Sequence, residues 1–168
     1  MDLSNNGLGP DSAVYINRIL KNVNLFHLHL GENMLGSDGI HHLNALKDNN
    51  HLMALNLSNN NINNDGVDAL ANILSTVGLQ NLSLGYNSFG CKGLKALLNN
   101  FPTSLTYLDL RGNYITDLCL ESLRSAISKG QLKTLILKDQ QGGYRWSEKS
   151  QSLLKGIGKD KDCRVILS

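Results

Sequence analysis

A nine-residue pattern recurs along this chain at an almost constant spacing. Three leucines precede a polar residue in the order L-x-x-L-x-L-x-x-N in the copies that end at Asn33, Asn60, Asn87 and Asn113, and a truncated copy with Met1 and Leu3 ends at Asn6. Successive asparagines lie 27, 27, 27 and 26 residues apart, and a sixth copy keeps its leucines but ends in Gln140. A repeat of this length constrains the fold more than any other feature, because each copy must form the same small unit and pack against its neighbours.

The first half of each unit predicts a short strand. In one unit Leu28 and Leu30 alternate with His27 and His29, so the leucines share one face and the histidines the other. The asparagine then stands where the chain turns, and its amide can pair with backbone groups that the turn would leave unpaired in the core. We therefore expect the asparagines to form a ladder through the stacked units.

The second half of each unit predicts a helix, because apolar residues recur there at spacings of three and four. After Asn87, for example, they are Leu94, Leu97, Leu98 and Phe101. The residue six positions beyond the asparagine is always small, which we expect to let helix and strand approach closely; these residues are Ser12, Gly39, Gly66, Gly93 and Cys119. Candidate helix N-caps lie in Gly36–Ser37–Asp38, Asn63–Asn64–Asp65 and Thr116–Asp117.

These units predict an α/β solenoid, a short horseshoe with a parallel β-sheet on the concave side and helices on the convex side. The chain resembles the ribonuclease-inhibitor type of leucine-rich repeat, through the N-x-L-x-x-x-G continuation of Asn33, Leu35 and Gly39. That resemblance implies a non-catalytic protein–protein interaction module. Some members of the family inhibit an enzyme by capping it, and others are GTPase activators or innate sensors.

Two parts are expected in the chain: residues 1–140 as about five repeat units, the first truncated, and residues 141–168 as a loop, helix and short strand that cap the solenoid. Ser147 can cap that helix, with Gly156 and Gly158 at its end, and Cys163–Leu167 reads as the last strand. Trp146 has two interpretations. It either closes the open hydrophobic end or lies on the rim as an aromatic anchor for a partner.

The composition of the chain limits the classes of function and the cellular locations that we expect for it. The 168 residues hold 18% charged side chains with a net charge of +2 and no basic cluster, so nucleic-acid binding is not expected. No apolar run comes near the length of a membrane span, and residues 1–6 do not resemble a signal peptide because they lack a basic segment followed by an apolar one. Cys91, Cys119 and Cys163 are scattered, which favours reduced, buried thiols and a cytoplasmic location.

The 21 asparagines are typical of short leucine-rich proteins that intracellular bacteria deliver into host cells. This resemblance implies a location in the host-cell cytoplasm. Its partner would be another protein, an enzyme or a second bacterial effector, and the free chain is expected to be monomeric. We expect no catalytic residue, cofactor or metal, because no G-x-S-x-G, phosphate loop or zinc motif occurs.

The candidate binding residues lie on the exposed face of the predicted sheet and at its ends. Aromatic residues and arginine are enriched at interface hot spots, and Tyr86, Tyr107, Asp109 and Arg111 converge near the middle. Beside them are the small residues Ser83, Gly85 and Gly112, which we expect to leave room for a partner. The full set is His27, His29, Glu32, Asn56, Tyr86, Tyr107, Asp109, Arg111, Lys133, Lys138 and Trp146.

Three alternatives remain open at this stage. The sheet face could be an ordinary solvated surface. The solenoid could regulate a GTPase through rim loops near Glu32, Asn59, Tyr86 and Asp139, or the chain could be a fragment of a larger receptor or sensor.

Overall fold

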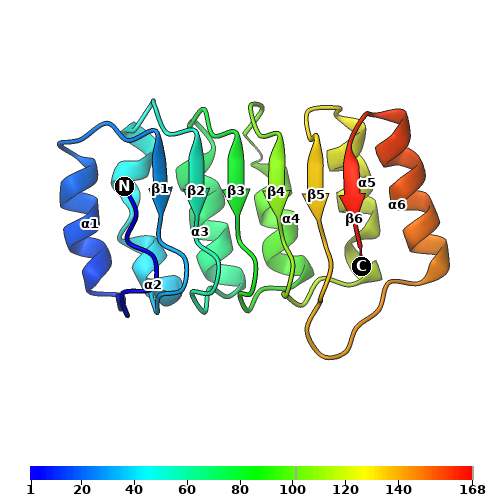
Figure 1. The fold of residues 1–168 in the computed structure, drawn as a ribbon, viewed down its shortest axis with the longest axis horizontal. Coiled ribbons are helices and arrows are strands. Elements are labelled where there is room, and N and C mark those ends of the chain that lie inside the picture. The colour runs from blue at the N-terminus through cyan, green and yellow to red at the C-terminus, as the bar shows by residue number, and fades with distance from the viewer. Residues whose placement is uncertain (101, 168) are drawn as a thin grey trace.

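The strands form a single parallel sheet in chain order. The computed structural model describes residues 1–100 and 102–167, so Phe101, the last residue of its predicted helical stripe, lies outside the described residues. The sheet contains β1 (His27–His29), β2 (Ala54–Asn56), β3 (Asn81–Ser83), β4 (Tyr107–Asp109), β5 (Thr134–Ile136) and β6 (Arg164–Ile166), as Figure 1 shows.

Neighbouring strands pair in the register of the repeat. Leu28 is opposite Leu55, Leu55 opposite Leu82, and Leu82 opposite Leu108. Residues Met1–Asn5 continue the sheet beyond β1, since the Asp2–His29 bridge is parallel. Equal positions of successive units therefore form rows across the sheet.

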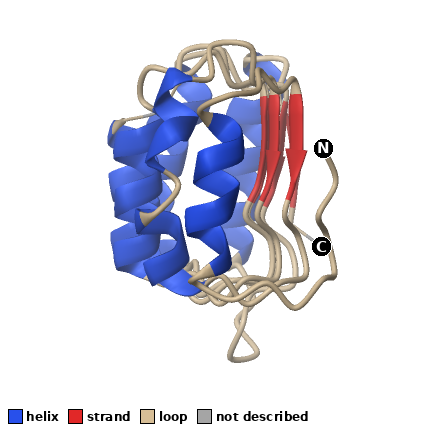
Figure 2. Ribbon diagram, turned by 90° about the vertical axis from the view of Figure 1, so that its left-hand side faces the viewer, coloured by secondary structure: helices blue, strands red, loops and turns tan. Residues whose placement is uncertain are grey.

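Helices make up the second layer, on one side of the sheet only (Figure 2). They are α1 (Ser12–Leu20), α2 (Gly36–His41), α3 (Asn64–Leu74), α4 (Cys91–Asn99), α5 (Leu120–Ser128) and α6 (Glu148–Asp160), with 3₁₀ segments η1 (Asn44–Asp48) and η2 (Asp117–Cys119). This arrangement confirms the predicted α/β leucine-rich repeat solenoid.

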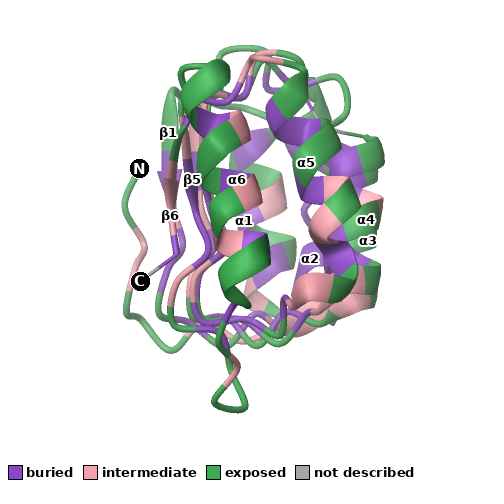
Figure 3. Cartoon of the chain, turned by 90° about the vertical axis from the view of Figure 1, so that its right-hand side faces the viewer, coloured by how far each residue is buried: buried purple, intermediate pink, exposed green. Residues whose placement is uncertain are grey.

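The core lies between the two layers. The strand leucines Leu28, Leu82 and Leu108 are 0% exposed, and so are Leu70 and Leu97 on the facing sides of α3 and α4. Figure 3 shows the buried sides of the helices turned toward the sheet and the exposed sides turned away from it. The two periodicities in the sequence thus meet in one continuous hydrophobic core.

The asparagine ladder joins successive units. Asn60 donates through Nδ2 to the Leu30 carbonyl of the preceding unit at 2.8 Å and to the Ser58 carbonyl at 3.0 Å. Gln140 does the same in its unit, donating through Nε2 to the Leu110 carbonyl at 3.0 Å. The glutamine therefore replaces asparagine without loss of the inter-unit bond.

The small residue at the sixth position after the asparagine permits close approach on two sides. A Cβ on Gly66 would lie 2.6 Å from Ser37 Oγ of the preceding unit and 2.7 Å from Ile62 Cγ2 of its own unit. A Cβ on Gly93 would lie 3.1 Å from Asn64 Cα of the preceding unit and 3.3 Å from Phe89 Cβ of its own unit. These glycines thus let each helix approach both the preceding unit and the turn that follows its own strand.

Two helices differ from their predicted extents. The stripe after Asn33 does not form one helix, because α2 ends at His41 and η1 begins at Asn44. Side chains replace the backbone bonds there: Asn44 Nδ2 donates to the His41 carbonyl at 2.9 Å, and Asn17 Oδ1 accepts from Ala45 N at 2.7 Å. The last helix, α6, continues through Gly156 and Gly158 to Asp160.

Three of the four predicted helix N-caps form a side-chain hydrogen bond. Asn63 accepts hydrogen bonds from Asp65 N and Gly66 N, Thr116 caps η2, and Ser147 accepts from Ser150 N at the start of α6. The helix α2 has Leu35 at its N-cap and no side-chain bond there.

Two of the three cysteines are joined, contrary to the expectation of reduced thiols. Cys91 at the start of α4 and Cys119 at the end of η2 form a disulfide with a Cα–Cα distance of 5.4 Å. Cys163 is free and buried, and burial raises the pKa of its thiol. The pairing arises because the two residues occupy nearby positions of adjacent units, a proximity hidden by their separation of 28 residues in the sequence.

Candidate functional site

The outer face of the sheet, away from the helices, carries a strip of small side chains. They stand in register on two neighbouring units and run along the strands: Ala54, Asn56 and Ser58 on one, Asn81, Ser83 and Gly85 on the other. We call this strip the trough. Ser58 Oγ and Ser83 Oγ lie 2.9 Å apart and link its two halves.

Larger side chains stand on both sides of the trough. His27 and His29 project from β1, and Tyr107 and Asp109 from β4. Three strand spacings separate β1 from β4, which amounts to about 14 Å between the two backbones. The trough is thus a walled depression rather than a flat sheet surface.

Two hollows occur along it. The first, about 340 Å³, is lined by Ala54, Asn56, Asn81, Ser83, His29 and Tyr107, and by the backbone of Leu55 and Leu82, whose side chains are buried in the core. The second, about 270 Å³, includes Glu32, Ser58, Tyr86, Asp109 and Arg111 in its lining. Asn56 lines both hollows, so they adjoin each other.

Arg111 is held in place by its neighbour on the wall. Its Nε donates to both Asp109 oxygens, at 2.9 Å and 2.8 Å, and its Nη2 lies 2.8 Å from Oδ2. The hydrogen bonds to Asp109 raise the pKa of the guanidinium further. The two charges compensate each other through these contacts, and the pair forms part of the wall, with Asp109 only 5% exposed.

Two of the glycines expected to leave room for a partner are covered instead. A Cβ on Gly85 would lie 3.1 Å from Arg111 Cγ, and one on Gly112 would collide with the Tyr86 ring. Both therefore let a neighbouring side chain lie flat across the backbone. Tyr86 remains 44% exposed and lies at the rim of the second hollow.

The rim residues of the GTPase alternative share one backbone conformation. Glu32, Asn59, Tyr86 and Asp139 all have positive φ, between 54° and 57°. This left-handed turn follows each strand and directs the residue before the asparagine toward solvent.

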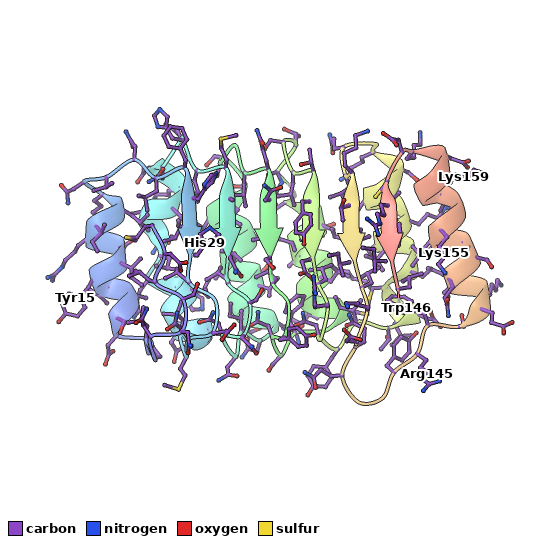
Figure 4. All side chains as sticks on the ribbon, viewed as in Figure 1. Tyr15, His29, Arg145, Trp146, Lys155 and Lys159 are labelled. Carbon is purple, nitrogen blue, oxygen red and sulfur yellow. A yellow bond between two sulfur atoms is a disulfide. The ribbon has the colours of Figure 1, made fainter. Side chains whose placement is uncertain are left out.

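The remaining candidates are separate from the trough. Lys133 Nζ lies 3.0 Å from Asp162, and Lys138 Nζ lies 3.7 Å from Asp139, both near the C-terminal strands. Trp146 is 5% exposed and donates its indole N–H to the Leu137 carbonyl at 3.2 Å. It lies at the end of the solenoid opposite His29, as Figure 4 shows, where it closes the core.

Sequence reasoning omitted the residues that make the floor. Ala54, Ser58 and Asn81 occupy the same columns of the repeat as the candidate residues. Because they are neither aromatic nor charged, they do not belong to the residue types that are enriched at interfaces. The informative feature is the contrast between small residues on two consecutive units and large ones on the flanking units.

Two classes of site are not found in the part of the chain that the structure describes. Within residues 1–100 and 102–167 no group of three His, Cys, Asp or Glu side chains could hold a metal ion. Over the same residues, no helix has both the length and the apolar character needed to cross a membrane.

Comparison with known proteins agrees with this architecture. Residues 48–71 and residues 104–126 each match a family profile described as leucine rich repeat. No curated protein sequence matches the chain.

Several solved structures share the fold at low sequence identity. Leiomodin-1 actin-binding site 2 has a TM-score of 0.69 at 12% identity, over 90% of this chain and 88% of that one. The tropomodulin C-terminal domain of Caenorhabditis elegans has a TM-score of 0.64 at 14% identity, over 90% and 92%. An internalin of Listeria monocytogenes has a TM-score of 0.57 at 18% identity, over 91% of this chain and 44% of that one. With the sheet register and the asparagine ladder, these matches identify the chain as a short leucine-rich repeat solenoid.

Proposed function

We propose that this chain is a non-catalytic binding module that holds another protein against the trough on its sheet face. The observation that carries the proposal is the trough itself, a floor of small and polar residues between walls that include His29 and Tyr107. Aromatic residues at the edge of a depression are common anchors of protein interfaces.

Inhibition or regulation of an enzyme is the form of binding we favour, as the resemblance to ribonuclease-inhibitor repeats implies. Six strands at about 4.8 Å span roughly 25–30 Å. A surface of that width suits one small globular partner, whose standard interface buries about 800 Å² per side.

The test is affinity capture from host-cell and bacterial lysates with three versions of the protein. The sheet-face variant is Asn81→Arg/Tyr107→Ala, which fills the trough and removes its wall. The control is Asn72→Arg, an exposed asparagine on α3, on the helix side. We expect a partner that wild type and control retain and the sheet-face variant loses. A partner retained equally by all three would contradict binding at the sheet face.

If the captured partner is an enzyme, its activity is then measured with increasing amounts of each version. We expect wild type and Asn72→Arg to reduce activity at stoichiometric amounts and the sheet-face variant to leave it unchanged. Unaltered activity in the presence of saturating wild type would contradict inhibition while leaving binding intact.

Actin is a second candidate partner, favoured by one observation. The leiomodin-1 structure, of which the match covers 88%, is named as an actin-binding site. Co-sedimentation with filamentous actin tests this directly, and absence of the protein from the pellet at saturating actin would exclude it.

The GTPase alternative predicts faster GTP hydrolysis by small GTPases and loss of that effect in Glu32→Ala/Tyr86→Ala.

A further inference from the structure

The geometry of the trough points to a particular kind of partner segment. Resting on the proposed function, we infer that the trough takes an extended peptide segment that carries an aromatic and a basic side chain four residues apart. The aromatic residue occupies the first hollow, and the basic residue lies at the Glu32 end of the second hollow.

The width of the trough decides between an extended segment and a helix. The walls on β1 and β4 stand about 14 Å apart between backbones, and their own side chains narrow the space between them. A helix with its side chains is about 10–12 Å across and would meet both walls before it reached the floor. An extended chain is narrower and can lie along the strands.

The floor offers groups that can pair with a peptide backbone. Asn56 Oδ1 accepts from Ser58 N at 2.9 Å, which fixes the side chain in place. Over the described residues, Asn56 Nδ2 and the side-chain amide of Asn81 make no hydrogen bond within the chain. A carboxamide offers two donors and an acceptor, so these two residues can bind main-chain groups of any sequence.

The first hollow suits an aromatic residue with a polar tip. Its floor is formed by the side chain of Ala54 and by the backbone of Leu55 and Leu82, whose own side chains are buried in the core, and Tyr107 provides a ring at one side. Polar side chains line it as well, His29 from β1 and Asn56, Asn81 and Ser83 from the trough. A tyrosine would bury its ring in the hollow and keep its hydroxyl near these polar groups.

The second hollow favours a positive charge. The charges of Asp109 and Arg111 compensate each other through the contacts described above. Glu32 is exposed and forms no ion pair with the described residues, so the hollow keeps a net charge of −1 from these three groups. A lysine or arginine of the partner would supply the missing countercharge.

The distance between the two hollows sets the spacing of the two side chains. The row of Leu55 lies four repeat positions before the row of Asn59, the counterpart of Glu32, and four residues in extended conformation span at most about 13 Å. An extended peptide covers that length in four residues, and residues i and i+4 point to the same face. The residue between them, i+2, lies over the row of Leu57, between Asn56 and Ser58, and should be small.

Two acetylated, amidated pentapeptides serve as probes, Tyr-Gly-Ser-Gly-Lys and its reverse, since the segment can run in either direction. Binding is followed by NMR through the side-chain amide signals of Asn56 and Asn81. We expect millimolar binding of at least one probe, with a loss of at least ten-fold when its Tyr is replaced by Ala or its Lys by Glu. The absence of shifts at both asparagines with both probes would overturn the inference.

A charge exchange tests the basic position. Glu32→Lys should reverse the preference, so that the probe with Glu in place of Lys binds the variant more tightly than the original probe does. Asp38→Lys, an exposed acid on α2, is the matched control and should behave as wild type. Equal binding of both probes to Glu32→Lys and to wild type would refute a basic occupant.

The failure of this inference and that of the proposed function are distinguishable. If the probes do not bind but a captured partner is lost in Asn81→Arg/Tyr107→Ala, the sheet face binds a different kind of segment. If the probes bind as expected but every captured partner survives that variant, the trough recognises peptides and the proposed function is wrong.

Discussion

Replacement of Asn87 by alanine provides the sharpest test of the ladder that joins the units. Its Oδ1 accepts from Asn60 N at 3.1 Å and from Ile62 N at 2.9 Å. Its Nδ2 donates to the carbonyls of Leu57 and Leu84, each at 3.0 Å, and to that of Gly85 at 3.3 Å. All five partners are backbone groups, and Asn87 itself is 2% exposed.

Asn113 occupies the next position of the ladder with a smaller set of bonds. It donates to the carbonyls of Leu84, Leu110 and Arg111, at 2.9, 3.1 and 3.1 Å. Its buried Oδ1 has no partner among the described residues. The spacing before this unit is 26 residues rather than 27, which makes it the irregular step of the repeat.

The two substitutions should therefore differ in cost. Asn87→Ala leaves two buried N–H groups unpaired, at about 1–3 kcal/mol each, and removes bonds to carbonyls worth about 1 kcal/mol more. We expect it to lower the free energy of unfolding by about 4 kcal/mol. Asn113→Ala removes only bonds to carbonyls, as many as Asn87 makes, and should cost about 1 kcal/mol.

Urea unfolding measures the difference, followed by circular dichroism and by the fluorescence of buried Trp146, the only tryptophan. Coincidence of the two transitions licenses a two-state comparison. If Asn113→Ala proves as costly as Asn87→Ala to within about 0.5 kcal/mol, or more costly, the reasoning about N–H groups is wrong.

Three further predictions concern the core, the disulfide and the C-terminal cap. Leu82→Ala, at 0% exposure, should cost about 2–5 kcal/mol in urea unfolding, whereas Leu118→Ala, at 85% exposure, should be neutral to within about 0.5 kcal/mol. Reduction of Cys91–Cys119, which spans 28 residues, should lower stability by about 3–4 kcal/mol; a thiol assay in denaturant should find one free cysteine before reduction and three after, and three before reduction would contradict the disulfide. Burial raises the pKa of Tyr144, whose hydroxyl accepts from Asp117 N at 2.7 Å. The contribution of Tyr144 to stability is therefore complete below the pKa of about 10 that tyrosine has in the unfolded chain, and it is lost as pH rises through the folded pKa. Tyr144→Phe should thus reduce the loss of stability at alkaline pH. An unchanged loss of stability at alkaline pH would refute this.

The architecture could be predicted from the repeat because its parts are local. Each strand has the period-two leucines, and Asn63, Thr116 and Ser147 cap the segments that follow them. The register across the sheet follows as well, since identical units stack at identical positions.

The candidate site could be predicted only in part. His29, Asn56, Tyr107, Asp109 and Arg111 do line the two hollows, since the repeat position places them on the outer face. Lys133, Lys138 and Trp146 do not, because their positions along the solenoid axis separate them from the trough.

The amino-acid sequence by itself determined the unit, its strand and helix, the ladder and the order of the strands. Each of these follows from residue types that recur at a fixed spacing, and that periodicity is visible in one dimension. Only the tertiary structure decided which glycines stay open and which are covered by Arg111 and Tyr86, that Cys91 meets Cys119, and that Trp146 turns into the core. The direction of a side chain and the space beside it are set by the neighbouring units, and contacts of that kind have no counterpart in the spacing of the sequence.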